Sequence, residues 1–144
     1  NPCGEQPLPP YGACLLGSIN LAKLVEHPFD KNAYLDVSQL EDLVFTAVRM
    51  MDNVIEVSQF PLEAQKLDSK TKRLTVLGGN GLADALFMVG LRYGSDEAVK
   101  KTEKWMKTIA RSAYNASINL AEEKGAFPLF DPEKFIVSGT NLDK

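Results

Sequence analysis

Residues 1–21 read NPCGEQPLPPYGACLLGSINL, and this stretch carries most of the chemistry in the 144-residue chain. Proline and glycine recur through residues 1–14. Proline fixes its own φ and supplies no backbone N–H, which excludes a regular helix there. We therefore expect an extended, stiff loop that carries both cysteines, Cys3 and Cys14. The apolar run at residues 15–25 is compatible with a short strand or with the start of a helix.

Asn1, Cys3 and Glu5 alternate along this extended segment, so their side chains are expected to share one face. That face would present an amide, a thiol and a carboxylate. An amide can orient a hydroxyl, a carboxylate can remove its proton, and a thiol can act as a nucleophile or as a hydrogen-atom donor. A neighbouring negative charge raises the pKa of a thiol, which argues against a thiolate nucleophile and is compatible with thiyl-radical chemistry.

The cysteines and the single histidine limit the other kinds of site. A closed zinc site takes about four Cys or His ligands, and the chain has two cysteines, one histidine and no CxxC pair, so no metal is expected. His27 lies in the polar stretch EHPF and is expected to be a solvated loop residue. Cys3 and Cys14 could form a disulfide, remain reactive thiols, or be buried as small apolar side chains.

Composition and charge exclude several classes of partner. Apolar residues make up 44% of the chain and charged residues 24%, which is typical of a globular domain. The net charge of −3 indicates no nucleic-acid partner. No run of 18 apolar residues is present, so no membrane span is expected. Without a secretory signal pattern, we expect a cytoplasmic protein with reduced thiols.

Residues 36–60 are predicted to form a helix. Ser38 and Glu41 match a capping box at its start. Apolar side chains recur at the spacing of one helical face: Leu40, Leu43, Val44, Ala47, Val48, Met51, Val54 and Ile55.

Two further helices are predicted, a short buried one over 81–91 and the longest over 95–124. Ser95 is the expected N-cap of the long helix, and Gly125 is its expected stop. Residues 65–72 are interpreted as a polar, lysine-rich connector, and the chain after Gly125 as a proline-interrupted connector with room for one short helix or strand.

Residues 73–84 read RLTVLGGNGLAD and concentrate three glycines within four positions. A phosphate approaches backbone closely only where side chains are small, so a phosphate-binding loop is one interpretation. The stretch matches neither GxxxxGK[ST] nor GxGxxG, and a tight strand-to-helix turn is the other interpretation.

The opening stretch resembles the active-site segment of the ribonucleotide reductases, most closely that of the adenosylcobalamin-dependent class II large chain. The resemblance continues in GLAD at 81–84, YGS at 93–95, EKG at 123–125 and FPLFD at 127–131, and it covers nearly the whole chain. Three positions depart from the family pattern. Leu15 replaces an asparagine, and Val76 and Gly79 stand where the family has Gly and Val.

The resemblance implies an α/β fold in which residues 1–144 form part of one catalytic domain, a ten-stranded α/β barrel of the ribonucleotide reductase and glycyl-radical type. Residues 1–14 would be the finger loop inside that barrel. The chain itself would be mostly α-helical with few short strands. We therefore expect an internal fragment of a longer protein, inactive alone, with some apolar helix surface lacking a partner.

The resemblance also implies a role for each residue of the opening stretch. Cys3 would be the thiyl radical that abstracts the ribose 3′-hydrogen, Glu5 the general base for the 3′-hydroxyl, and Asn1 the residue that orients the substrate. Cys14 would be one of two thiols that reduce the substrate and end as a disulfide, with its partner upstream of this chain. A disulfide between Cys3 and Cys14 is then not expected.

The implied reaction is reduction of a ribonucleoside diphosphate or triphosphate to its deoxy form for DNA synthesis, with adenosylcobalamin as cofactor. The implied partners are the ribonucleotide substrate, dNTP and ATP effectors bound elsewhere, a thioredoxin-type reductant and a second copy of the full-length chain. Two alternatives stay open: a class I large subunit whose radical comes from a separate subunit, and a non-enzymatic helical scaffold domain.

Overall fold

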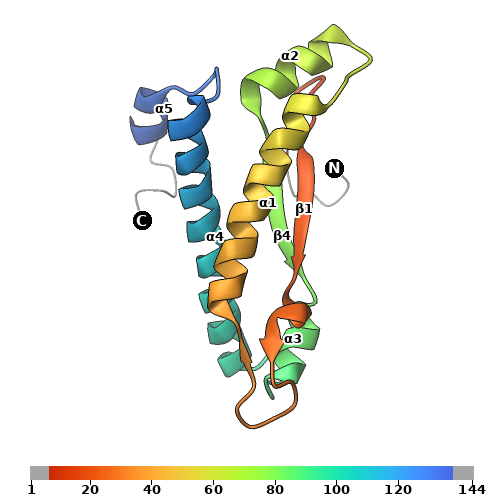
Figure 1. Cartoon of the computed structure of the whole chain (residues 1–144), viewed down its shortest axis with the longest axis vertical. Helices are drawn as coiled ribbons and strands as arrows, with labels where there is room; N and C mark the ends of the chain where they lie inside the picture. The colour runs from red at the N-terminus through yellow and green to blue at the C-terminus, as the bar shows by residue number, and fades with distance from the viewer. Residues whose placement is uncertain (1–6, 138–144) are drawn as a thin grey trace.

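The computed structural model describes residues 7–137, which form helices and two small sheets around an apolar core (Figure 1). In chain order the elements are β1 (Leu15–Asn20), the 3₁₀ helix η1 (Leu21–Leu24), β2 (Val25–Glu26), β3 (Tyr34–Leu35), α1 (Val37–Val57), α2 (Glu63–Lys72), β4 (Thr75–Asn80), α3 (Leu82–Met88), α4 (Asp96–Lys124) and α5 (Pro132–Val137).

The central unit is a parallel strand pair with a helical crossover. β1 and β4 pair in parallel from Leu15 opposite Thr75 to Asn20 opposite Asn80. Parallel strands need a long connection, and here α1 and α2 supply it. Helix α1 runs alongside both strands in the opposite direction (Figure 1). The approach is close at Gly17, where a Cβ would lie 2.8 Å from the Sδ atom of Met51.

Helix α1 begins and ends inside the predicted limits of 36–60, and its predicted capping box is wrong. The N-cap is Asp36, whose carboxylate accepts from the Gln39 amide at 2.9 Å. A carboxylate both accepts this hydrogen bond and complements the positive helix N-terminus, so the helix starts before Ser38.

The apolar face of α1 is narrower than the sequence spacing suggests. Its buried side chains are Leu40, Val44, Val48, Met51 and Ile55. Leu43 and Val54, assigned to the same face, are 40% and 36% exposed. They lie about 100° around the helix from their buried neighbours, which turns them away from the core.

The connector predicted over 65–72 is wrong, because α2 occupies Glu63–Lys72. Lysine and glutamine are polar but are also good helix formers, so a polar, lysine-rich stretch can form a solvent-exposed helix. The ammonium of Lys70 donates to the carbonyl oxygens of Ile55 at 2.8 Å and Glu56 at 2.7 Å, which are near the end of α1. This contact with α1 anchors the short helix.

Helices α3 and α4 begin close to where the sequence predicts them, but α3 ends early. Helix α3 is shorter than the predicted 81–91 and begins after Gly81, which has φ 66°. Helix α4 begins after Ser95, whose hydroxyl accepts from the Ala98 amide at 3.2 Å, and ends at Gly125 with φ 87°. Both ends of α4 are those the sequence predicts. The proline-interrupted stretch after Gly125 contains α5.

The core lies between the strand pair, α1, α3 and α4, and its largest fully buried side chain is Trp105. Apolar side chains also remain on the surface, including Val57 at 76% and Leu67 at 66% exposed. The described part of the chain has the expected character, mostly helical with few short strands, and neither sheet in it is closed. Among these residues no helix is long and apolar enough to cross a membrane.

Candidate functional site

Three of the four residues predicted to act in catalysis, Asn1, Cys3 and Glu5, lie outside the described residues. The fourth, Cys14, is described. It is half-buried and its thiol is free. The geometry of the site is therefore that of the loop before Cys14 and of the strands that follow it.

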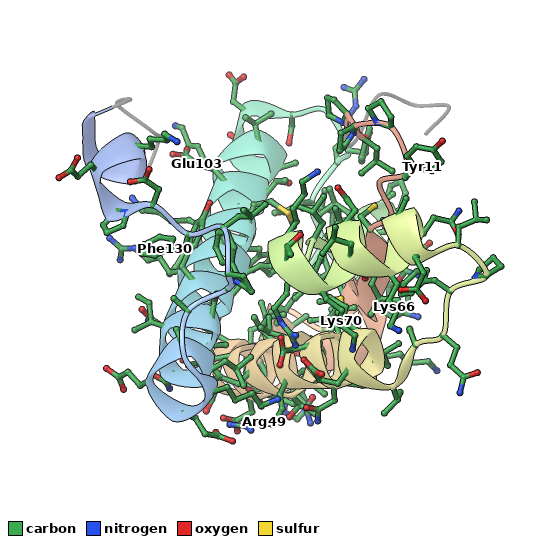
Figure 2. All side chains as sticks on the ribbon, turned by 90° about the horizontal axis from the view of Figure 1, so that it is seen from above. Tyr11, Arg49, Lys66, Lys70, Glu103 and Phe130 are labelled. Atoms are coloured by element: carbon green, nitrogen blue, oxygen red, sulfur yellow. The ribbon has the colours of Figure 1, made fainter. Side chains whose placement is uncertain are left out.

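A tight turn at Pro9–Gly12 leads the chain into Cys14. The Gly12 amide donates to the Pro9 carbonyl at 2.9 Å, and Tyr11 at the third position of the turn has φ 62°. A Cβ at Gly12 would lie 2.8 Å from the Pro9 carbonyl oxygen, so the turn needs glycine there. The Tyr11 side chain is 60% exposed and projects outward (Figure 2).

Cys14 is held at the start of the parallel strand pair. The amide of Leu15 donates to the carbonyl of Leu74 at 3.0 Å, which extends the pairing one step ahead of β4. The peptide bond immediately after Cys14 is therefore part of the sheet ladder. A backbone in such a ladder has little freedom, so the strand pair restricts where this thiol can lie.

The strand pair has one face against the helices and one open face. Ile19, on the helix side, is 8% exposed, whereas Leu16 is 61% exposed. Gly78 lies opposite Ser18, on the side of Leu16, and a Cβ there would meet no atom within 4 Å. Side chains alternate along an extended chain, so Cys14 belongs to this open face.

The glycine-rich stretch forms a strand followed by a tight turn, which confirms the strand-to-helix interpretation of residues 73–84. Gly81 occupies the left-handed region, and a Cβ there would lie 2.7 Å from Oδ1 of Asn20. At Gly79 a Cβ would lie 3.3 Å from Cδ1 of Leu21, so a valine would crowd that buried side chain. The departure from the family pattern at Gly79 thus matches the packing around it.

A cluster of charged side chains lies beside the start of β4, the end of the sheet where Cys14 enters. Arg73 Nε donates to Asp52 Oδ1 at 2.9 Å, and the same guanidinium contacts the carboxylate of Glu56. Lys124 Nζ lies 2.8 Å from Asp52 Oδ2, and Lys70 Nζ lies 3.2 Å from Glu56 Oε2. These five residues, the charged cluster, join α1, α2 and α4.

The charges of the cluster favour one another's ionised forms. Burial raises the pKa of Asp52, but hydrogen bonds from Lys124 and Arg73 outweigh burial and hold that pKa below its usual value. Hydrogen bonds from Arg73 and Lys70 lower the pKa of Glu56. Burial lowers the pKa of Arg73, but hydrogen bonds from Asp52 and Glu56 outweigh it and leave that pKa raised.

Sequence reasoning missed this cluster, although one signal was present. Asp52 and Glu56 are four residues apart in a predicted helix, so they had to share a face. Nothing local indicated that Arg73, 21 positions after Asp52, would meet them.

The charged cluster borders a cavity of 540 Å³ between α1, α4 and the start of β4. Its outer wall is the segment after Gly125, including Phe127, Pro128 and Phe130 (Figure 2). The amide of Leu129 donates to the Thr71 carbonyl at 3.3 Å, which holds this wall against the end of α2.

His27 lies on an exposed turn with φ 50°, next to the ring of Tyr34. This position agrees with the solvated loop residue predicted for it. Over residues 7–137, no three His, Cys, Asp or Glu side chains gather in a way that could hold a metal ion.

Comparison with known proteins relates the strand pair and its preceding loop to a known domain. Residues 1–144 match the family described as "Ribonucleotide reductase, barrel domain". The chain belongs to this family. The family resemblance seen in the opening stretch is thereby confirmed, and the described strands and helices are part of a ribonucleotide reductase barrel domain.

Individual relatives agree with this assignment. The chain is 42% identical over 139 residues to a vitamin B12-dependent ribonucleoside-diphosphate reductase of Mycobacterium tuberculosis, covering 96% of this chain and 19% of the relative. It is 44% identical over 128 residues to the protein of that name from Thermoplasma acidophilum, covering 89% and 16%. A ribonucleoside-diphosphate reductase subunit alpha of Chlamydia pneumoniae is 36% identical over 122 residues, covering 85% and 11%. The chain thus spans a fifth or less of the length of these relatives.

Proposed function

We propose that this barrel-domain chain belongs to a ribonucleotide reductase that converts ribonucleotides to deoxyribonucleotides by thiyl-radical chemistry. The observation that carries the proposal is the 42% identity to a reductase over 96% of the chain. Because the chain spans only a fifth of that relative, the activity is assigned to the whole protein. A non-enzymatic scaffold would leave the amide, thiol and carboxylate of the opening stretch unexplained.

The proposed roles are those that the family resemblance implies for these residues. The Cys3 thiyl radical takes the 3′-hydrogen of the ribose and the Cys3 thiol returns it to the sugar at the end of the cycle. Glu5 takes the 3′-hydroxyl proton, and Asn1 orients the sugar. The 2′-hydroxyl leaves as water, and two thiols supply the two electrons and become a disulfide. Cys14 is one of these thiols. Its free state and its place at the start of the ladder support that role.

The substrate class also follows from the relatives. Both class II relatives are named ribonucleoside-diphosphate reductases, so we assign a ribonucleoside diphosphate as substrate in preference to a triphosphate. A thioredoxin-type reductant would return the oxidised thiols to their working state. We further propose dNTP and ATP effectors, a dimer of the full-length chain and a cytoplasmic location.

The cofactor we propose is adenosylcobalamin, because the relatives at 42% and 44% identity carry a vitamin B12-dependent name. When bound, it would supply the radical that forms at Cys3. The described residues do not fit the corrin ring: the 540 Å³ cavity is bordered by the charged cluster, and His27 lies on an exposed turn. We therefore propose that the cobalamin contacts lie outside residues 7–137.

A class I enzyme is the second candidate, because the Chlamydia relative at 36% identity is named as a subunit alpha. In that case a separate subunit would supply the radical. The higher identity to the vitamin B12-dependent relatives favours class II.

The test is nucleotide reduction by the full-length protein with and without adenosylcobalamin. We expect deoxynucleotide product only with the cofactor, and none from the Cys3→Ala variant. Arg49→Gln, in an exposed ion pair between α1 and α4, is the control and should retain product formation. Product formation by Cys3→Ala would overturn the radical assignment. Activity that needs a second protein and no cobalamin would favour the class I candidate.

A further inference from the structure

Arg73 occupies an unusual position between α2 and β4. It has φ 51° and ψ 48°, the left-handed conformation that ends α2, and its amide donates to the Ser69 carbonyl at 2.9 Å. A side chain in this region costs free energy that glycine avoids. An arginine there calls for a compensating interaction.

The guanidinium of Arg73 makes that interaction with α1. Besides its bond from Nε to Asp52 Oδ1, a terminal nitrogen lies 2.5 Å from the same carboxylate oxygen and 3.1 Å from the Asp52 backbone carbonyl. The other terminal nitrogen contacts Glu56. The Arg73 and Asp52 side chains are only 18% and 16% exposed, so water screens this pair weakly.

The next residue along the chain connects this arrangement to Cys14. Leu74 follows Arg73 directly, and its carbonyl accepts the Leu15 amide at 3.0 Å. Leu15 in turn follows Cys14. Arg73 is therefore the direct neighbour of Leu74, whose carbonyl holds the backbone next to the Cys14 thiol.

We propose that Arg73 is a positioning residue for Cys14. Its guanidinium fastens the left-handed end of α2 to α1, which places the Leu74 carbonyl where it receives the Leu15 amide and so sets the position of the Cys14 thiol at the open face. The inference rests on the proposed function in one respect, because the purpose of holding the thiol is its reaction with substrate.

The chemistry of the side chain explains why arginine serves here. The guanidinium is a planar fork that donates to Asp52, to its backbone carbonyl and to Glu56 together. A lysine would keep the charge and lose this fork. A glycine would relieve the backbone and lose every contact with α1. Arg73→Lys therefore isolates the loss of the fork, whereas Arg73→Gly removes the charge and the fork and relieves the backbone strain together.

The experiment measures amide exchange and thiol alkylation in the full-length protein, resolved by mass spectrometry to Leu15 and to the Cys14 peptide. The variants are Arg73→Gly and Arg73→Lys. The control is Arg49→Gln, which removes an exposed arginine–carboxylate pair with Glu123 that joins α1 to α4. Intact folding of each variant is checked by circular dichroism.

We expect the Leu15 amide to exchange about tenfold faster in Arg73→Gly, with exchange at Asn20, the far end of β1, unchanged. The rate at which the Cys14 thiol is alkylated should also change severalfold in the same variant. Arg73→Lys should reproduce both effects in part, because it keeps the charge alone. Arg49→Gln should change neither measurement.

The inference is overturned if Leu15 exchange is unchanged in Arg73→Gly. It is also overturned if exchange rises equally at Leu15 and Asn20, since that result means general destabilisation. A parallel assay of nucleotide reduction by Arg73→Gly should show a lower kcat with little change in the KM for nucleotide. If the protein reduces no nucleotide, the proposed function fails, while exchange and alkylation still decide whether Arg73 positions Cys14.

Discussion

Lys124 Nζ lies 2.8 Å from Oδ2 of Asp52, and this contact joins the last turn of α4 to the C-terminal part of α1. The same ammonium donates a second hydrogen bond, to Asn53 Oδ1 at 2.8 Å. Asp52 receives Arg73 on its other oxygen, so a single carboxylate connects α1 to α4 and to the approach to β4.

Asp52 should make the stability of the protein sensitive to acid. Its pKa is lowered in the folded state, so its contribution is present above the unfolded-state pKa and is lost as pH falls through the folded value. We expect the urea concentration at the unfolding midpoint to decrease as the pH is lowered below about 4, the ordinary pKa of an aspartate. Asp52→Asn should destabilise the protein by about 1–3 kcal/mol at pH 7 and weaken that pH dependence. Glu123→Gln, in an exposed pair, is the control.

The packing of α1 on β1 predicts opposite outcomes at two strand glycines. Gly17→Ala should destabilise the protein by about 1–3 kcal/mol, because the new methyl group meets the buried Met51 sulfur. Gly78→Ala should change stability little, because its Cβ would enter open space. Thermal unfolding of both variants checks this. Equal changes at the two positions would contradict the assigned faces of the sheet.

The start of α1 can be tested with two single substitutions. Asp36→Ala should cost about 0.5–2 kcal/mol, because it removes the acceptor of the Gln39 amide. Ser38→Ala should be close to neutral, because Ser38 lies inside the helix and is exposed. Denaturant unfolding measures both. A larger loss at Ser38 would restore the capping box predicted from the sequence.

The proposed role of Cys14 predicts loss of catalytic turnover without loss of fold. In the full-length protein, Cys14→Ala should abolish multiple turnovers with a dithiol reductant, because one of the two reducing thiols is missing. Circular dichroism should be unchanged, since alanine fits a half-buried position. Multiple turnovers by this variant would contradict the reductant role, even if Cys3 is confirmed as the radical residue.

Local sequence predicted the elements whose signals lie within a few residues of one another. The long helix α4 carries its N-cap at Ser95 and its stop at Gly125, and both signals act over one turn. The turn at Gly81 was recognisable because glycine tolerates the left-handed region. The family resemblance of the opening stretch could also be recognised from the sequence, since it depends on residue order alone.

The candidate site was only partly predictable. Cys14 was identified, but its place at the head of a parallel ladder depends on Leu74, 60 positions along the chain. Helix α2 was missed because its support is the contact of Lys70 with carbonyls of α1. The charged cluster was missed for the same reason.

The sequence alone was enough for both ends of α4, the Gly81 turn and the family to which the chain belongs, because residues close together or in fixed order carry those signals. Tertiary structure was needed for the pairing of Leu15 with Thr75 and for the meeting of Arg73 with Asp52. Those contacts exist only after the crossover helix has folded back on its strands, since chain topology brings distant residues within hydrogen-bond range.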